Sequence, residues 1–255
     1  MKVQFLSDLH IEFPENRQWL SKHAIPVLGD VLVLAGDIMP LAQLDHHADF
    51  ITYLSDHFSQ VFWIPGNHEY YYHAIDDYVY TSEIDLRKNV KLVHNKAVQY
   101  NDVRFVFSTL WSKVPSSLAS IIQERLSDFF LIKYQNKPID TDLYNVLHDI
   151  SVQFLTRELS DEFSQPSQTI VVTHHVPTLY KYPSKYLHSK INAAFAVEMK
   201  DFIHATQPDF WIFGHHHSNV KPFQIGKTRF LTNQLGYVRY REHTGFQPNL
   251  FLEIA

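Results

Sequence analysis

Cysteine is absent from this chain of 255 residues. The protein therefore has neither disulfides nor thiolate metal sites, and its strong metal ligands can only be histidine, aspartate, glutamate and asparagine. Glycine is scarce, with seven residues, whereas histidine is abundant, with seventeen. We expect most of these histidines to lie at the surface or to serve packing, so a ligand has to be recognised from its position in the chain.

Long apolar runs and clusters of basic residues are missing as well. No stretch approaches the ~20 apolar residues that a membrane span needs, and residues 1–10 hold too short an apolar run for a secretory signal. We therefore expect a cytoplasmic protein with no membrane partner. The net charge is −5, from 22 basic and 27 acidic residues, and no run of Lys and Arg could neutralise a phosphate backbone. Both features argue against nucleic acid as a partner.

The apolar residues that are present predict an α/β fold. A hydrophobic content of 45% is enough for a sizeable core, and the length fits one domain over residues 1–255. Strand and helix patterns alternate, which indicates a mostly parallel sheet. We expect strands at Val3–Leu6, Asp30–Asp37, Val61–Ile64, Val90–Val93, Arg104–Phe107, Thr169–Thr173, Phe210–Phe213, Phe230–Leu235 and Leu250–Ile254, and helices at Leu44–Phe58, Ile75–Lys88 and Asn192–His204.

The pattern changes between residues 116 and 163. Apolar residues follow helical spacing from Leu118 to Phe129 and again from Leu143 to Phe154, with Asn136-Lys137-Pro138 between the two stripes. No catalytic constellation lies within them. We interpret this region as a helical insertion that flanks a site and contributes to its specificity.

A sharp turn follows the apolar strand at Val61–Ile64. A Pro-Gly pair ends the strand, and Asn67, His68 and Glu69 then emerge together. Asn67 offers an amide oxygen and His68 an imidazole that titrates near neutrality. Taken alone, the turn has an equally simple structural explanation, in which the Asn accepts a positive φ and the His is solvated.

Other expected strands end in similar residues. Asp8 and His10 follow the first strand, where an extended backbone would point both side chains to one side. The other blocks at strand ends are Gly36-Asp37, His174-His175 and Gly214-His215-His216-His217. Carboxyl ends of parallel strands meet at one edge of a sheet, which favours a single polynuclear metal centre. Nitrogen and oxygen ligands of this kind suit two divalent transition metal ions such as Mn, Fe, Zn or Co.

In this order, the five blocks resemble the motifs of the calcineurin-like metallophosphoesterase superfamily. The resemblance spans residues 8–217 and extends to Leu235-Gly236-Tyr237, which is similar to a common family ending. It implies a four-layer αββα sandwich of two mixed β-sheets flanked by helices. It also implies two metal ions: one held by Asp8, His10 and His217, the other by Asn67, His174 and His215, with Asp37 bridging them.

The resemblance assigns His68 a catalytic role without a metal, facing the leaving group. It implies in-line attack by a metal-bridging hydroxide on a small phosphodiester or phosphomonoester, with the diester slightly favoured. His175 could exchange roles with His174, and we expect His175, His216, Tyr70 and Trp111 to be substrate contacts. The chain departs from the family at Pro40, where many relatives have a second acid, and no phosphate-binding arginine can be placed.

Two alternatives remain at this point. The first is a catalytically silent scaffold of the same fold that binds proteins, although none of the ligand positions is missing here. The second is a nuclease of the same superfamily, against which the acidic balance argues. The sequence carries no sign of oligomeric state.

Overall fold

Two mixed six-stranded sheets lie face to face in the structure, a computed structural model that describes residues 1–76, 81–160 and 168–254. The first sheet has the order β14-β1-β2-β3-β5-β4 and the second β12-β13-β11-β10-β7-β6. The strands of the first sheet are β1 Lys2–Leu6, β2 Val31–Ala35, β3 Gln60–Ile64, β4 Glu83–Arg87, β5 Val90–Val93 and β14 Phe251–Glu253. Those of the second are β6 Lys96–Tyr100, β7 Val103–Ser108, β10 Gln168–Thr173, β11 Phe210–Ile212, β12 Phe223–Ile225 and β13 Thr228–Leu231.

The inner strands of each sheet run parallel, and the edge strands are antiparallel. Successive side chains of a strand point to opposite faces, so a strand with helices on one side and a second sheet on the other is apolar throughout. β2 follows this rule: Val31 and Val33 face the core between the sheets, whereas Leu32 and Leu34 face the outer helices. This double burial explains the continuous apolar run in the sequence.

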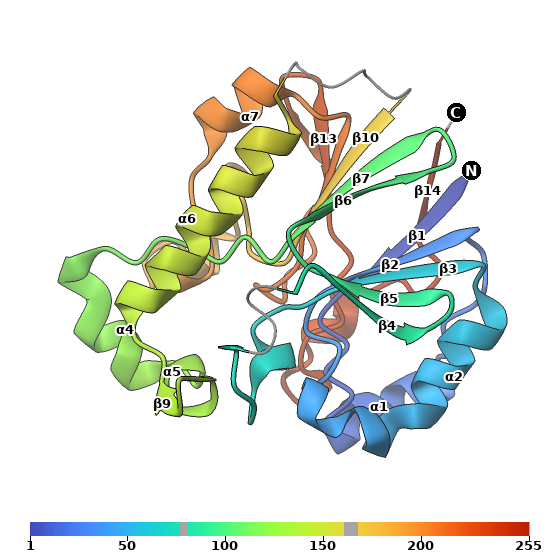
Figure 1. Ribbon diagram of the computed structural model, residues 1–255, viewed down its shortest axis with the longest axis horizontal. Helices are drawn as coiled ribbons and strands as arrows, with labels where there is room; N and C mark the ends of the chain where they lie inside the picture. The colour runs from blue at the N-terminus through green and yellow to red at the C-terminus, as the bar shows by residue number, and fades with distance from the viewer. Residues whose placement is uncertain (77–80, 161–167, 255) are drawn as a thin grey trace.

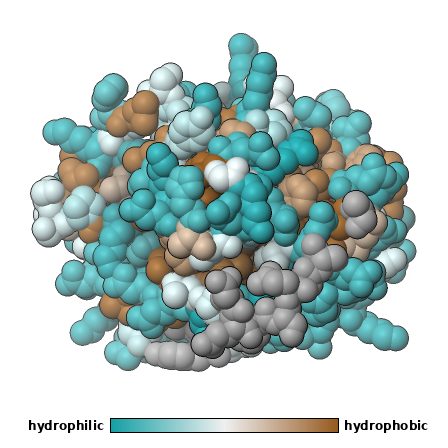
Figure 2. Space-filling view, turned by 90° about the horizontal axis from the view of Figure 1, so that it is seen from above, coloured by the Kyte–Doolittle hydropathy of each residue, from teal (hydrophilic) through white to brown (hydrophobic). Residues whose placement is uncertain are grey.

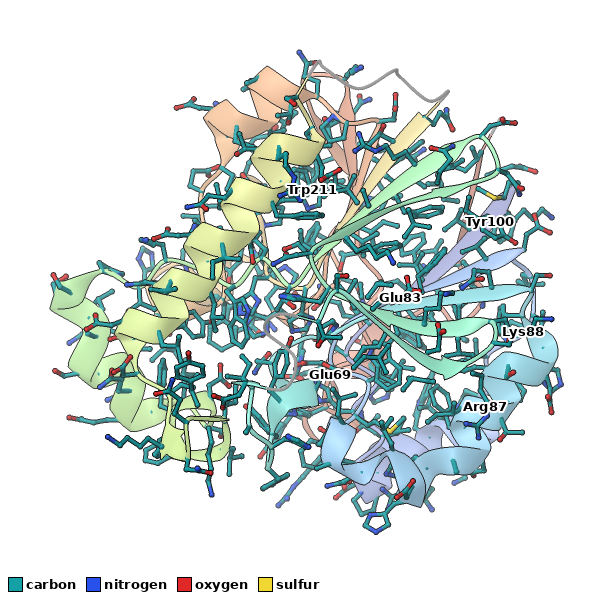
Figure 3. The ribbon with its side chains drawn as sticks, in the orientation of Figure 1. Glu69, Glu83, Arg87, Lys88, Tyr100 and Trp211 are labelled. Carbon is teal, nitrogen blue, oxygen red and sulfur yellow. The ribbon has the colours of Figure 1, made fainter. Side chains whose placement is uncertain are left out.

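Helices cover the outer face of each sheet, which gives four layers and confirms the expected α/β sandwich (Figure 1). Helices α1 Pro14–Lys22 and α2 Ala48–His57 pack on the first sheet. α6 Thr141–Glu158 and α7 Lys200–Thr206 pack on the second, where Trp211 lies between them and the strands (Figure 3). The chain ends lie side by side, since the Met1 amino group donates a hydrogen bond of 3.0 Å to the Ile254 carbonyl.

The helical insertion is confirmed over its described part, residues 116–160, with two additions. Its first stripe is interrupted at Leu126–Ser127, and a short hairpin precedes α6. The elements before α6 are α4 Ala119–Arg125, α5 Asp128–Leu131, β8 Lys133–Tyr134 and β9 Lys137–Pro138. They enclose a separate apolar core with Phe129 and Tyr144. Seven short 3-10 helices lie in the described chain: η1 Leu41–His47, η2 His68–Tyr70, η3 Ser116–Leu118, η4 Ser184–Tyr186, η5 Asn192–Ala194, η6 Val238–Tyr240 and η7 Glu242–Gly245.

Two expected helices were wrong. Residues 83–87 of the range Ile75–Lys88 form strand β4, because they pair with β5, and residues 77–80 lie outside the described residues. The range Asn192–His204 is split into η5 and α7. Between them, the Val197 N–H donates to the Val176 carbonyl at 3.0 Å, so this backbone serves a strand-like bridge instead of a helix.

The exterior is mainly hydrophilic on the face seen from above, with scattered hydrophobic patches (Figure 2). Among the helices of the described residues, none combines the length and the apolar character that a membrane crossing requires.

Candidate metal centre

The blocks at the strand ends converge in space. Asp8 and His10 follow β1, Asp37 follows β2, and Asn67 follows β3. The other histidines of the site follow β10 (His174) and β11 (His215 and His217). The sequence suggested an extended backbone at these strand ends, but the backbone there is not extended. Asp8, His10, Asp37, His215 and His217 all have a positive φ, between 45° and 79°. This left-handed backbone costs of order 1 kcal/mol per residue, and strain of this kind is characteristic of functional sites.

One group of ligand atoms combines Asp8, His10, Asp37 and His217, all within 4.8 Å of one another. The Nε2 atoms of His10 and His217 are 3.0 Å apart. His217 Nε2 lies 3.3 Å from Asp8 Oδ1, and His10 Nε2 lies 3.7 Å from Asp37 Oδ2. Two carboxylates and two imidazoles thus meet at one point.

A second group combines Asp37, His174 and His215. His174 Nε2 lies 3.0 Å from His215 Nδ1, 3.4 Å from Asp37 Oδ1 and 3.2 Å from Asn67 Oδ1. Asp37 therefore presents one oxygen to each group. A carboxylate in this position is suited to a ligand that two cations share.

Two glycines make this convergence sterically feasible. A Cβ on Gly36, whose φ is +88°, would collide with the ring of His174. A Cβ on Gly66 would collide with the Asp37 carboxylate. Because only glycine lacks this atom, the two residues allow the ends of β2 and β3 to approach the ligands closely.

The buried carboxylates and imidazoles of the site shift one another's pKa values strongly. Burial raises the pKa of Asp37, but the neighbouring imidazoles of His174 and His68 outweigh it and hold this pKa well below its usual range. Burial lowers the pKa of His174, but the Asp37 and Asp8 carboxylates raise it to about 9. In the same way, Asp8 and Glu242 raise the pKa of His217 to about 10 against the effect of burial. The buried carboxylates therefore stabilise positive charge at this site. The nitrogen and oxygen donors fit divalent transition metals.

Hydrogen bonds on the far side of the rings orient several of the imidazoles. His217 Nδ1 lies 2.7 Å from Glu242 Oε2, and His174 Nδ1 lies 2.9 Å from the Ala35 carbonyl. Such partners keep the proton on Nδ1 and leave Nε2 free for a metal.

The two residues of the His174-His175 doublet have different surroundings. His174 faces the second group, as described above. Both ring nitrogens of His175 are engaged elsewhere: Nε2 lies 2.8 Å from the Tyr144 hydroxyl and Nδ1 3.2 Å from the Thr109 carbonyl. The geometry therefore favours His174 over His175 as a ligand.

The candidate site opens into a cleft of about 380 Å³. Asp37, Asn67, His68, His215, His216 and His217 line its floor. The walls come from the insertion (Arg125, Leu126, Ser127, Asp128), from the segment 182–195 (Tyr182, Tyr186, Ser189, Ile191, Asn192, Phe195), and from Tyr71, Tyr237 and Glu242. Asp8, His10 and His174 do not line the cleft, and each is 0% exposed.

Three of the expected substrate contacts lie outside this cleft. Tyr70 and Trp111 are each 1% exposed and pack in the core of the insertion, because their large rings fill the space against Tyr144 and Phe129. His175 is 0% exposed. Of the four residues, only His216 lines the cleft, so we keep it alone as a candidate substrate contact.

His68 lies at the edge of the cleft floor. Its Nδ1 is 2.8 Å from Glu12 Oε1, its Nε2 is 3.3 Å from the Tyr237 hydroxyl, and its ring stacks on Tyr71 at 4.1 Å. Burial lowers the pKa of His68, but the charges of Asp37 and Glu12 outweigh it and raise this pKa. A positively charged His68 can donate a proton into the cleft.

The sequence reasoning missed three carboxylates that surround the ligands. Glu12, two residues after His10, contacts His10 and His68. Asp128 accepts from Asn67 Nδ2 at 2.8 Å and from the Tyr71 hydroxyl at 2.7 Å. The signal for Glu12 was its place within the first block, whereas no motif indicated Asp128 or Glu242.

Glu69 has a structural position, although it directly follows His68. Its buried carboxylate accepts hydrogen bonds from four N–H groups: those of Asp37 (2.9 Å), Ile38 (2.7 Å) and Gly66 (2.6 Å), and the Trp63 indole (3.0 Å). It therefore joins the loops after β2 and β3, deep inside the molecule (Figure 3).

Known proteins resemble this chain along most of its length. Protein L509 of Acanthamoeba polyphaga mimivirus is 29% identical over 279 residues, which cover 99% of this chain and 96% of that protein. Phosphopantetheinyl hydrolase from Mycobacterium tuberculosis has a similar structure, with a TM-score of 0.72, 18% identity and coverage of 97% and 94%. A dimetal phosphatase from Danio rerio follows, with a TM-score of 0.50, 13% identity and coverage of 97% and 89%. Residues 1–219 match the family of calcineurin-like phosphoesterases, so the chain belongs to that family.

Proposed function

We propose that this protein hydrolyses a small phosphoester with the help of two divalent transition metal ions, Mn, Fe, Zn or Co. Family membership and the clustered His and Asp residues support a metal-dependent phosphoesterase. The observation that carries the proposal is the pair of ligand groups that share Asp37. We further propose that residues 1–255 act as one unit, because the insertion supplies part of the cleft wall.

The proposed ligands of the first ion are Asp8, His10 and His217, and those of the second are Asn67, His174 and His215, with Asp37 common to both. When bound, the cations would supply Lewis acidity for phosphoryl oxygens and lower the pKa of water enough to provide a nucleophile near neutral pH.

His68 would act on the leaving group. Its Nε2 faces the Tyr237 hydroxyl at the cleft wall, while Nδ1 is held by Glu12. A protonated His68 can therefore give its Nε2 proton to the departing oxygen and take a proton back from water afterwards. The stacked ring of Tyr71 keeps the imidazole plane aligned with the cleft.

The cleft favours a small substrate with a partly apolar leaving group. Its volume of about 380 Å³ lies at the lower end of ordinary ligand sites. Tyr182, Tyr186 and Phe195 offer ring surfaces. Arg125 is a cation in the same wall, where the sequence alone could not place one, but Asp128 and Glu242 carry negative charge there. This balance supports a monoanionic diester slightly over a dianionic monoester.

The proposal is tested by comparing a nitrophenyl phosphate with its bis-ester under Mn, Fe, Zn and Co. We expect metal-dependent release of nitrophenol, faster from the bis-ester, and two metal ions per chain in protein purified without chelator. Asp37→Asn should lose both activity and metal, whereas Asp45→Asn, which changes an exposed acid of η1, should lose neither. A metal-free and inert wild-type protein would contradict the proposal and support the scaffold.

The role of His68 has its own test. We expect His68→Ala to keep both metals and the fold but to lose about 10²–10⁴-fold in rate. The loss should grow as the leaving group becomes more basic, because a poor leaving group depends most on the donated proton. An equal loss for all leaving groups would reject this role.

A further inference from the structure

The side chain of Glu12 is shared by two imidazoles with different tasks. Its Oε1 lies 2.8 Å from His68 Nδ1 and 3.2 Å from His10 Nδ1. The edges of the two rings meet at this oxygen, and the ring centroids are 4.4 Å apart. Glu12 is thus the direct link between a proposed metal ligand and the proposed proton donor.

The carboxylate of Glu12 is well suited to orient these rings. Its side chain is 8% exposed, so water does not compete strongly for the two N–H donors. Its second oxygen, Oε2, is buried and has no hydrogen-bond partner among the described residues. Among the described residues, no hydrogen bond to Oε2 therefore competes with the two histidines for the Glu12 carboxylate.

Both hydrogen bonds leave Nε2 of each ring directed elsewhere. Nε2 of His10 faces His217 and Asp37, whereas Nε2 of His68 faces Tyr237 at the cleft wall. The His10 backbone N–H also donates to the Asp37 carbonyl at 3.0 Å, so His10 is held by the metal-site loop even without Glu12. The His68 backbone N–H is held in a similar way, by Asp37 Oδ1 at 2.9 Å, so the backbone of both residues is fixed. Among the described residues, Glu12 is the hydrogen-bond partner of His68 Nδ1, and this bond orients the ring within that frame.

We propose that Glu12 is a positioning residue for the reaction: anchored on His10, it holds the His68 ring so that Nε2 delivers its proton to the leaving-group oxygen. The inference rests on the proposed role of His68. In the proton transfer, the Nε2–H bond breaks and an O–H bond forms on the leaving group, while the proton on Nδ1 stays in its hydrogen bond to Glu12. Glu12 itself loses and gains no proton.

The experiment combines Glu12→Gln and His68→Ala in a double-mutant cycle, at saturating metal and with esters of nitrophenol and of an alkyl alcohol. We expect Glu12→Gln to lower kcat about 10–100-fold on the alkyl ester and less on the nitrophenyl ester, with metal content and KM unchanged. In the His68→Ala background, the same substitution should change kcat less than about twofold, because its effect passes through His68. Glu15→Gln, the same change at an exposed residue of α1, is the matched control and should leave kcat unchanged.

The outcomes separate the two hypotheses. If His68→Ala shows no dependence on the leaving group, the proposed role of His68 fails, and the Glu12 inference fails with it. If His68→Ala shows this dependence but Glu12→Gln acts equally in both backgrounds, only the Glu12 inference is overturned. A loss of bound metal in Glu12→Gln would also overturn it, because Glu12 would then belong to the metal ligands.

Discussion

The carboxylate of Asp128 accepts a hydrogen bond of 2.8 Å from the side-chain amide of Asn67. The amide nitrogen is thereby turned toward helix α5 and the amide oxygen toward His174, 3.2 Å away. A residue of the insertion therefore decides which atom of Asn67 faces the second ligand group. Through this hydrogen bond the insertion reaches the candidate metal centre as well as the cleft wall.

Replacement of Asp128 by Ala should lower the affinity of the second ligand group for its proposed metal ion. Without its acceptor, the Asn67 amide loses the bond that keeps its oxygen toward His174, and partners of this kind typically change metal affinity about 10–100-fold. Metal titration followed by calorimetry should show one weakened site and one unchanged site. Asp142→Ala, which changes an exposed acid of α6, is the control. Equal affinities in Asp128→Ala and the wild type would contradict the orienting role.

Replacement of Glu69 by Gln should destabilise the fold. The carboxylate accepts from four N–H groups, and a Gln side chain would turn an NH2 group against some of them. A buried donor left without an acceptor costs ~1–3 kcal/mol, and we expect the free energy of unfolding of the metal-free protein to fall by about that amount in urea.

Glu83→Gln is the matched control for this prediction. Glu83 lies on strand β4 (Figure 3) and is paired with Lys91 and Lys96, with its side chain 23% exposed. Partly exposed ion pairs contribute ~0–1 kcal/mol, so Glu83→Gln should lower the free energy of unfolding less than Glu69→Gln does. A larger effect at Glu83 than at Glu69 would count against our reading of the Glu69 contacts.

Stability should fall on acidification because of His94. Burial lowers the pKa of His94 to about 4, from an ordinary value of 6.5. Between these two pKa values the unfolded chain binds a proton at His94 that the folded chain does not bind. The contribution of neutral His94 to the free energy of unfolding is therefore complete above pH 6.5 and is lost as pH falls toward 4. The full loss corresponds to about 3 kcal/mol.

The His94 prediction is measured as the difference between wild type and His94→Gln in the free energy of unfolding. This difference should shrink between pH 7 and pH 4.5, because Gln does not titrate. Gln224→Asn, a change without a titratable group at an exposed position of β12, should show the same pH profile as the wild type. A constant difference between wild type and His94→Gln across this range would refute the assignment.

How far the sequence leads can be judged from particular segments. Apolar runs such as Val31–Ala35 were predictable, because double burial leaves a continuous hydrophobic signature. The structure of the range Ile75–Lys88 was not predictable in this way. Strand β4 within it lies at a sheet edge and depends on pairing with β5 rather than on its own composition. Strand β6 and helix α1 were also missed.

The sequence by itself determined that Asp8, Asp37, Asn67, His174 and His215 each stand just after a strand, and with this the family and the chemistry of the proposed ligands. Local spacing sufficed for this because each proposed ligand follows its own strand by a few residues. Only the tertiary structure decided that Glu12 meets His68 and that Asp128 meets Asn67, 61 residues away along the chain. Such contacts depend on how loops and helices pack over the sheet edge, and that arrangement follows from the sum of many distant interactions.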